Sequence, residues 1–410
     1  MKKLLFLCAV AVALATACTS EDRKLYYSSS DGLIITPSET ASFGANITSN
    51  TYKDGQGVMV FDAPVTSIGE VAFAGCNTLV SITIPVGVTS IGDKAFEDCA
   101  QLRSIIIPDG VTSLGKSVFN KCNELRSVTI GNGVTAIEDN LFSDCTNLTS
   151  VVIGSSVASI GNNAFFKCSG LTSIAIPDSV TSIGEKAFAL CSSMTSATIG
   201  SSVESIGVNA FYGCSSLESI AIPDSVTRLG KSAFQGCNAL TSVTIGNGVK
   251  SIGENTFNGC KSLTKAVIGD GVATIGFSAF YRCTSLTDLT IGNSVTKIGK
   301  GAFNECRNLK SVIIPDSITI IEDSAFGWCG QLESVTIGKN IKAVGYCAFA
   351  GNGKLKSVYI KATTPPMGDM NMFYNIALDC KLYVPEASVT YYKTKTYWNR
   401  YAAKFVGHNF

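Results

Sequence analysis

Residues 88–108 read VTSIGDKAFEDCAQLRSIIIP, and this stretch carries two different hydrophobic periods. Residues 104–107 alternate between two faces, which is typical of a short strand, and Pro108 closes that strand. Residues 88–91 predict a second short extended piece, which Gly92 ends. Between the two, apolar side chains spaced i, i+1, i+4 and i+7 favour one or two helical turns with a single apolar face. These side chains are Ala95, Phe96, Cys99 and Leu102.

The same pattern returns every 23 residues. The Cys of the unit occurs at Cys76, Cys99, Cys122, Cys145, Cys168, Cys191, Cys214, Cys237, Cys260, Cys283, Cys306 and Cys329, and a thirteenth unit has Asn352 in its place. The Phe holds the period throughout, at Phe73, Phe96, Phe119, Phe142, Phe165, Phe188, Phe211, Phe234, Phe257, Phe280, Phe303, Phe326 and Phe349. The sequence therefore predicts 13 coils over residues 65–361.

A single unit of this length buries too little apolar surface to offset the conformational entropy lost on ordering it. Stacked units share a continuous core, and the stability of such an array comes from contacts between neighbours. We therefore expect an α/β solenoid of about 13 coils, with a parallel sheet on one face, short helical or irregular turns on the other, and terminal caps. At about 4.8 Å per strand, the array would be about 60 Å long.

A family resemblance is visible in the strand of the unit. Leu102-x-x-Ile105-x-Ile107 resembles the L-x-x-L-x-L core of leucine-rich repeats. The whole unit, V-T-S-I-G-x-x-A-F-x-x-C-x-x-L-x-S-I-x-I-P, is similar to the BspA-like leucine-rich repeat of bacterial surface lipoproteins. This resemblance implies a leucine-rich-repeat solenoid whose strand sheet forms the concave face. For the founding members of the family it also implies adhesion to host proteins such as fibronectin and fibrinogen.

The N-terminus predicts export. Lys2 and Lys3 precede an uncharged run over residues 4–17, which fits a signal peptide and is too short for a membrane-spanning helix. Ala15-Thr16-Ala17-Cys18 resembles a bacterial lipobox, in which the Cys is acylated, although Ala15 departs from the larger aliphatic residue usual there. Ala15-Thr16-Ala17 also fits the A-x-A rule of ordinary signal peptidase. We expect residues 1–17 to be a signal peptide, Cys18 a lipid anchor, and residues 18–24 a tether. The expected location is the outer membrane or cell surface.

The two ends of the chain break the repeat. Residues 25–64 are interpreted as an N-terminal cap, with strands expected over residues 32–35 and 58–61. Residues 362–410 are interpreted as a C-terminal cap that resembles the terminal segment closing such arrays. A helical face is expected there against the last coil, formed by Val389, Tyr392, Trp398, Tyr401 and Phe405. The alternative interpretation of these aromatic residues is a ligand site.

Composition excludes several classes of function. The formal net charge is +1, so the chain as a whole would not attract nucleic acid. His408 is the only His, which excludes a three-histidine metal site and leaves no embedded Ser/His/Asp triad. The sequence contains none of the P-loop, dinucleotide-binding, G-x-S-x-G and H-E-x-x-H motifs. We expect a protein that is not an enzyme and that needs no metal or other cofactor.

The Cys column has three interpretations. Equivalent residues on adjacent coils would lie about 4.8 Å apart, and their Cβ atoms would be too distant for an unstrained disulfide. A buried ladder of free thiols is favoured, because Cys packs as a small apolar residue. Some disulfides remain an alternative, with Cys347 and Cys380 the first candidates. A straight column without C-x-x-C pairs is poorly suited to a tetrahedral metal site.

The outward positions of the predicted strands form a candidate recognition surface. One row is nearly all Ser, and Lys265 and Asp288 interrupt it. A broad hydroxyl surface of this kind suits an extended protein or glycan, although Ser and Thr also simply suit a regular exposed sheet. The candidate ligand-binding residues are Ser242, Lys265, Asp288, Lys310 and Tyr359.

These observations predict a cell-surface binding or adhesion protein. Its solenoid would recognise host or bacterial proteins or glycans noncovalently, and an extracellular-matrix protein or glycan of the host is the expected partner. Its lipid would attach it to the membrane, and no nucleic acid would be bound. The alternative is a structural spacer or assembly component of the cell envelope.

Overall fold

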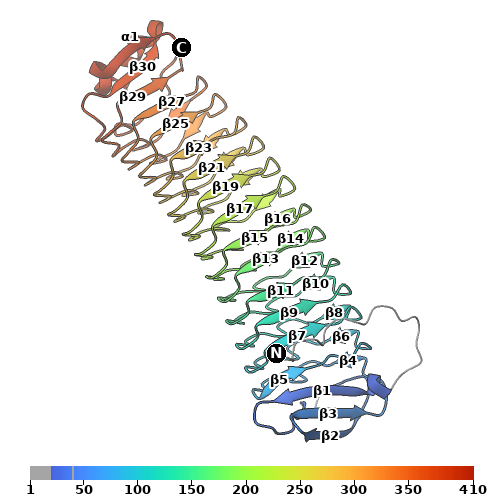
Figure 1. Cartoon of the computed structure of the whole chain (residues 1–410). Helices are drawn as coiled ribbons and strands as arrows, with labels where there is room; N and C mark the ends of the chain where they lie inside the picture. Colours follow the sequence, from blue (N-terminus) through green and yellow to red (C-terminus); the bar gives the residue numbers. More distant parts are fainter. Residues whose placement is uncertain (1–19, 39–40) are drawn as a thin grey trace, which may run out of the picture.

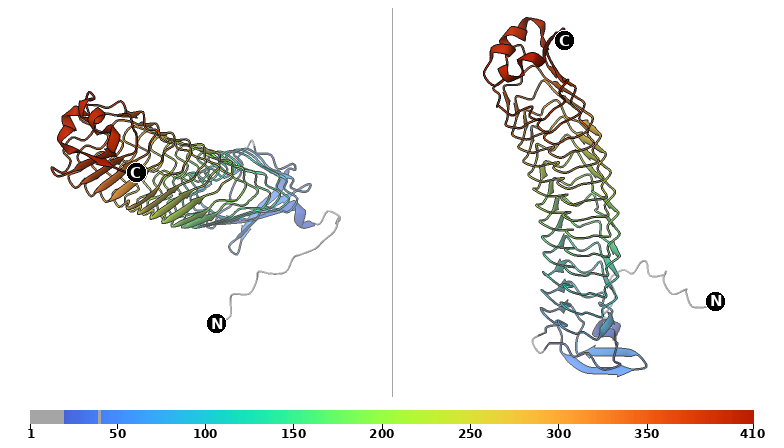
Figure 2. Two further views of the ribbon diagram at one scale, coloured as in Figure 1. Left: turned by 90° about the horizontal axis from the view of Figure 1, so that it is seen from above. Right: turned by 90° about the vertical axis from the view of Figure 1, so that its left-hand side faces the viewer.

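The computed structural model describes residues 20–38 and 41–410. Figure 1 shows coils stacked along one axis, with β1 (Lys24–Ser29), β2 (Ile47–Lys53) and β3 (Gln56–Phe61) across one end of the rod and α1 (Val389–Thr394) at the other. The two further views in Figure 2 show a long, gently bent rod. The core runs along its interior as one continuous apolar cluster from Leu25 to Phe405. The predicted solenoid is therefore confirmed.

The longer strand of each coil carries the alternating pattern, with isoleucine, valine or alanine side chains inward and serine and threonine outward. Nearly all pair in parallel with exact 23-residue registers, as Ser104 does with Ser127. The strands are β5 (Leu79–Ile82), β7 (Ser104–Ile107), β9 (Ser127–Ile130), β11 (Ser150–Val152), β13 (Ser173–Ala175), β15 (Ser196–Thr198), β17 (Ser219–Ile222), β19 (Ser242–Ile245), β21 (Lys265–Ile268), β23 (Asp288–Thr290), β25 (Ser311–Ile314), β27 (Ser334–Ile337) and β29 (Ser357–Ile360).

A second, shorter strand in each coil confirms the expected extended piece before the glycine. These strands pair in parallel in the same register, as Ser90 does with Ser113. They are β4 (Ser67–Ile68), β6 (Ser90–Ile91), β8 (Ser113–Leu114), β10 (Ala136–Ile137), β12 (Ser159–Ile160), β14 (Ser182–Ile183), β16 (Ser205–Ile206), β18 (Arg228–Leu229), β20 (Ser251–Ile252), β22 (Thr274–Ile275), β24 (Lys297–Ile298), β26 (Ile320–Ile321) and β28 (Ala343–Val344).

The segment between the strands is an irregular turn, so the expected helical turns are absent from the described coils. Over residues 93–98, alternate backbone N–H groups bond within the coil and to the next coil. Glu97 N–H donates to the Lys94 carbonyl (3.0 Å), whereas Phe96 N–H donates to the Val118 carbonyl (2.9 Å). Lys94 and Asp98 have φ of 55° and 56°, which an α-helix does not allow. Hydrogen bonds to the neighbouring coil therefore prevent the helix that the spacing of the apolar side chains favours.

In most coils a glycine after the short strand allows close approach between coils, although Glu138 and Glu322 stand at this position in two of them. A Cβ on Gly92 would lie 2.5 Å from the Glu70 backbone nitrogen, and one on Gly115 would lie 2.4 Å from the Asp93 nitrogen. Neither glycine has a positive φ. The repeat therefore keeps glycine here because adjacent backbones nearly touch, and not because the turn demands a left-handed conformation.

The repeated Phe and Cys side chains form two buried columns. The Phe rings stack coil on coil, with centroids 5.4 Å apart and an interplanar angle of 5° between Phe96 and Phe119. The thiol of Cys99 donates to the Phe73 carbonyl (3.1 Å), and ten further Cys residues make the equivalent bond. Asn352 Nδ2 makes it in the thirteenth unit, to Phe326 at 3.0 Å. All fourteen described Cys residues, Cys347 and Cys380 included, are free thiols.

The N-terminal cap is an antiparallel sheet in the order β2-β3-β1-β5. Its strands are β1 (Lys24–Ser29), β2 (Ile47–Lys53) and β3 (Gln56–Phe61), preceded by the 3-10 helix η1 (Ser20–Arg23). The strand expected over residues 58–61 lies within β3, whereas residues 32–35 form no strand and the expectation there was wrong. Part of the segment interpreted as a tether contacts the first coil, because the Val65 N–H donates to the Asp22 carbonyl (2.9 Å).

The C-terminal segment begins as a further coil rather than as a cap. Phe373 stacks on Phe349 with centroids 5.5 Å apart, and β30 (Lys381–Pro385) pairs in parallel with β29. The predicted number of coils was therefore too low. The sequence did not reveal this further coil, because its Phe follows the previous one by 24 residues and the rest of the repeat pattern is missing. The chain then forms η2 (Glu386–Ser388), α1 (Val389–Thr394), η3 (Asn399–Lys404) and β31 (Phe405–His408).

The expected aromatic packing at this end is present, although the helix is short. Tyr392 and Trp398 are fully buried, and Trp398 Nε1 donates to the Pro366 carbonyl (2.8 Å). α1 covers six residues and is the single α-helix in the described part of the chain. No helix there is long and apolar enough to cross a lipid bilayer.

The buried thiols predict loss of stability in alkali. Burial raises the pKa of Cys214, Cys260 and Cys329 to about 12, whereas an unfolded thiol ionises near pH 8.5. Above about pH 8.5 the unfolded chain binds fewer protons than the folded chain, so the free energy of unfolding falls as pH rises. Each thiol contributes up to about 1.4 kcal/mol per pH unit. We expect the urea midpoint to fall steeply between about pH 8.5 and 10.5.

The control for this prediction is a triple variant with Cys214→Ala, Cys260→Ala and Cys329→Ala. Its stability at neutral pH falls because three cavities form. Its pH slope should nevertheless be shallower than that of the native chain by the contribution of three thiols. An unchanged slope would show that the thiols do not cause the alkaline loss.

Candidate ligand-binding face

The outward side chains of the longer strands form one surface along the rod, called here the strand face. Two rows compose it, because alternate strand residues point outward. The first row is Ser81, Ser104, Ser127, Ser150, Ser173, Ser196, Ser219, Ser242, Lys265, Asp288, Ser311, Ser334 and Ser357. The second is Thr83, Ile106, Thr129, Val152, Ala175, Thr198, Ala221, Thr244, Val267, Thr290, Ile313, Thr336 and Tyr359.

The strand register brings three of the predicted site residues together. Ser242 is directly opposite Lys265, and Lys265 is directly opposite Asp288. Lys265 Nζ lies 3.0 Å from Asp288 Oδ2, and the two side chains are 56% and 54% exposed. An ion pair this open to water contributes little to stability. The pair is therefore the charged interruption of an otherwise hydroxyl-bearing row.

The surface beside Ser242 is slightly hollowed. Ala197 and Ala221 are small, and with Ser219, Ser242 and Thr244 they line a shallow depression of about 390 Å³. Large apolar side chains elsewhere in the second row stand out from the sheet, including Ile106 (62% exposed) and Ile313 (71%). The strand face is thus broad and uneven, which suits an extended ligand better than a small molecule.

The other two predicted residues lie apart from this group. Lys310 is exposed and precedes Ser311, so it borders the strand face near Asp288. Tyr359 is in the second row, three coils beyond Asp288. The five predicted residues therefore do not form a single pocket.

Tyr359 belongs to an aromatic cluster that the sequence reasoning missed. Its ring stacks on Tyr383 with centroids 4.7 Å apart and an interplanar angle of 11°. His408 meets both rings edge-on, at 5.5 and 5.7 Å, and Phe410 packs on His408 at 4.8 Å. The signal was present in Leu382-Tyr383-Val384, which repeats the alternation of Val358-Tyr359-Ile360 with a 24-residue offset.

The described residues offer little for covalent chemistry. They contain no group of three or more His, Cys, Asp or Glu side chains placed to hold a metal ion. The column thiols are buried, and burial raises the pKa of Cys122, Cys168 and Cys191 well above the ordinary value. Such thiols are poor nucleophiles at neutral pH. Cys18 lies outside the described residues.

Basic side chains in the later coils are largely paired with carboxylates. Lys297 lies 2.6 Å from Glu322, Arg282 lies 3.4 Å from Glu305, and Lys300 lies 3.9 Å from Asp323. These pairs link neighbouring coils on different sides of the rod. The described structure therefore shows no single basic patch in this region.

Stacked coils of this strand-and-turn design define a leucine-rich-repeat solenoid. The BspA type leucine-rich repeat region (6 copies) matches residues 46–172, 158–287 and 273–403, so the chain belongs to this family. No curated protein sequence matches the chain.

Three solved structures are similar to this chain. A leucine rich cell surface protein of Faecalibacterium prausnitzii is 31% identical, with 68% of this chain and 84% of that chain covered and a TM-score of 0.42. A leucine-rich repeat protein of Bacteroides ovatus is 28% identical, with coverages of 78% and 88% and a TM-score of 0.44. The pneumococcal vaccine antigen PcpA is 19% identical, with coverages of 88% and 87% and a TM-score of 0.43. Membership of this family agrees with a protein-binding role.

Because both side chains of the Lys265–Asp288 ion pair are exposed to water, we expect a small coupling free energy between them. In a double-mutant cycle of Lys265→Ala and Asp288→Ala, measured by urea unfolding, the coupling free energy should be about 0.2–1 kcal/mol because water screens both groups. A coupling above about 2 kcal/mol would mean that the pair is structural and not available to a partner.

Proposed function

We propose that this protein is an exported, cell-surface binding protein that recognises proteins or glycans noncovalently with its strand face. The observation that carries the proposal is the strand face itself, which is largely exposed, follows the rod for about 60 Å, and is contacted by His408 at its C-terminal end. A broad surface of hydroxyl groups offers donors and acceptors in a fixed two-dimensional array. Its expected partners are matrix proteins or glycans of a host, or components of other bacteria.

Aperiodic residues on the strand face would supply the specificity. Identical hydroxyls on successive coils cannot distinguish one position along a ligand from the next. Lys265 and Asp288 add one charge of each sign, and the cluster at Tyr359 and Tyr383 adds an aromatic surface of the kind enriched at interfaces. Ser242 and Lys310 would flank these features. The proposal includes no catalytic step.

The chain from residue 19 onward, with its thiols kept reduced, should bind a member of a panel of matrix proteins, mucins and bacterial glycans. Lys265→Glu and Asp288→Lys should each weaken that binding by about tenfold or more, because each reverses a charge at the contact. Tyr359→Ala should also weaken it, by removal of an aromatic anchor. Surface plasmon resonance at two salt concentrations measures these changes, and higher salt should weaken a charged contact.

Lys186→Glu is the matched control, because this exposed side chain lies in a turn and pairs only weakly with its neighbour Glu185. It should bind like the native chain. Absence of binding across the panel by a folded protein would favour a spacer or assembly component. Equal losses in the control and the strand-face variants would place the contact elsewhere.

Lipid attachment at Cys18 is the second part of the proposal. It rests on the lipobox-like Ala15-Thr16-Ala17-Cys18 and on the cell-surface character of the family. In cells fed an alkyne analogue of palmitate, the native protein should be labelled and should sediment with membranes. Cys18→Ala should abolish the label, because it removes the thiol that the lipobox-like sequence presents for acylation. A label that persists in Cys18→Ala would overturn the assignment.

A further inference from the structure

Two residues in each turn have a left-handed backbone, and at the second of these positions one coil carries tryptophan. Equivalent positions, 23 residues apart, form what we call the turn column, and in Trp328 φ is 58°. The column is Gly75, Asp98, Lys121, Asp144, Lys167, Leu190, Gly213, Gly236, Gly259, Arg282, Glu305, Trp328 and Gly351. Most of these residues are not glycine, so the left-handed backbone belongs to every coil, and Trp328 differs from the others in carrying a large aromatic side chain. Trp328 is 54% exposed.

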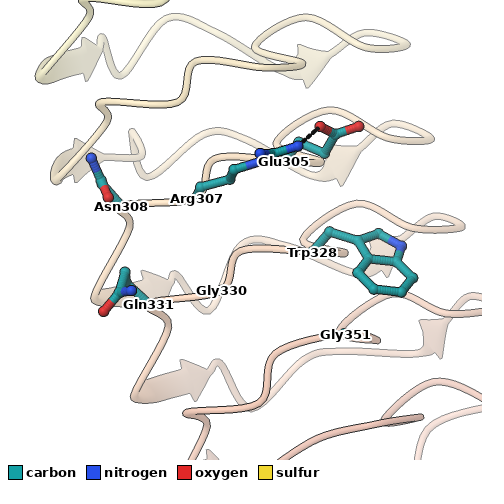
Figure 3. A pocket seen from close by; sticks show the side chains of 7 residues that line it. All are labelled: Glu305, Arg307, Asn308, Trp328, Gly330, Gln331 and Gly351. Atoms are coloured by element: carbon teal, nitrogen blue, oxygen red, sulfur yellow. Dashed lines mark hydrogen bonds and ion pairs between the residues drawn. The ribbon is translucent and has the colours of Figure 1, made fainter.

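Two glycines line the groove beside the indole ring. A Cβ on Gly330 would meet no atom within 4 Å, so this position opens onto free space. A Cβ on Gly351 would lie 2.6 Å from Trp328 Cδ2, so the backbone of the next coil supports the ring. The result is a groove of about 560 Å³ on the turn side of the rod, shown in Figure 3. This volume is typical of small-molecule sites.

Polar groups of several kinds line the groove beside the indole. Figure 3 shows Glu305 and Arg307 on the adjoining coil, with the amides of Asn308 and Gln331 at the opposite side from Trp328. Arg307 Nη2 donates to Glu305 Oε2 (2.7 Å), which fixes the guanidinium at the edge of the groove. The amides supply both donors and acceptors, and the guanidinium supplies donors.

The carboxylate in the groove is already balanced by cations. Glu305 accepts hydrogen bonds from Tyr281 (2.9 Å) and Arg282 (3.4 Å) as well as from Arg307. Burial opposes ionisation of Glu305, but the bonds from Arg307 and Tyr281 and the charge of Arg282 lower its pKa below the ordinary value. The two charged residues that line the groove, Glu305 and Arg307, carry one charge of each sign, which favours a neutral ligand over an anion or a cation there.

We propose that this groove binds a neutral pyranose residue of a glycan. The C–H face of a pyranose ring would stack on the exposed indole, because an aromatic face packs well against an apolar surface. Its hydroxyl groups would bond to the Arg307 guanidinium, and the amides of Asn308 and Gln331 at the far side of the groove would bond the hydroxyl groups of a neighbouring residue of the glycan. The groove is on the turn side and shares no residue with the strand face. The sugar site therefore goes beyond the proposed function, and the two can be tested independently.

Intrinsic fluorescence tests the proposal directly. The chain has two Trp residues, and Trp398 is fully buried, so Trp328 is the one open to ligand. The probes are hexamers of β-1,4-glucose, β-1,4-N-acetylglucosamine, α-1,4-glucose and β-1,4-mannose, titrated to about 10 mM. We expect at least one to give a saturable emission change and saturation-transfer NMR signals from its ring protons. No response to any of the four would overturn the proposal, and so would a response to choline chloride alone.

Two variants separate the site from the fold. Trp328→Gly suits the left-handed backbone, since glycine occupies the same column at Gly351, and Gly330→Gln fills the open groove without a positive φ. Each should weaken the NMR-detected binding by about tenfold or more. The matched control Phe277→Ala removes another exposed aromatic ring and should bind normally. Equal binding by Trp328→Gly would overturn the site, whereas Lys265→Glu should leave sugar binding intact and affect the strand face only.

Discussion

Contact between adjacent coils is the interaction on which the whole structure depends. The Phe rings stack at centroid distances such as 5.3 Å between Phe73 and Phe96, and the Cys thiol of the following unit reaches back to the carbonyl of the same Phe. Alternate turn N–H groups also bond across to the next coil. Because no coil can satisfy these groups alone, folding must join neighbours, and the ends need covers. The antiparallel sheet of β1–β3 and the buried Tyr392 and Trp398 supply them.

The periodic part of this fold could be predicted from the sequence because the same pattern of buried and exposed residues recurs in every coil. Alternation in residues 104–107 gave the strand, and the spacing of Phe96 and Phe119 gave the coil length. The turns could not be predicted as well. The spacing of Ala95, Phe96 and Cys99 satisfies a helix, and only the hydrogen bonds to the next coil prevent one. Helical propensity is a weak prior that tertiary contacts override.

The aperiodic ends were harder to predict for the same reason. The coil that contains Phe373 keeps the stacking contact but not the residue pattern, so it was interpreted as cap. The cluster of Tyr359, Tyr383 and His408 joins residues whose sequence offsets are 24 and 25, which the 23-residue period does not match. Placement of Lys265 beside Asp288 needed only the period. The groove at Trp328 depended on turn geometry that the sequence did not show.

A regular solenoid is stabilised by identical contacts between successive coils, whereas recognition of a particular ligand requires side chains that differ from coil to coil. Nearly every coil keeps its Phe, its Cys and its close-approach glycine, with Asn352 replacing one Cys and Glu138 and Glu322 replacing two of the glycines, so those positions have little freedom to vary. The outward strand rows and the turn column make few contacts of this kind. Arg282, Glu305, Trp328 and Gly351 follow one another in that column on the same backbone. The fold therefore tolerates very different side chains there, and it is at such positions that binding sites can be built without loss of the stack.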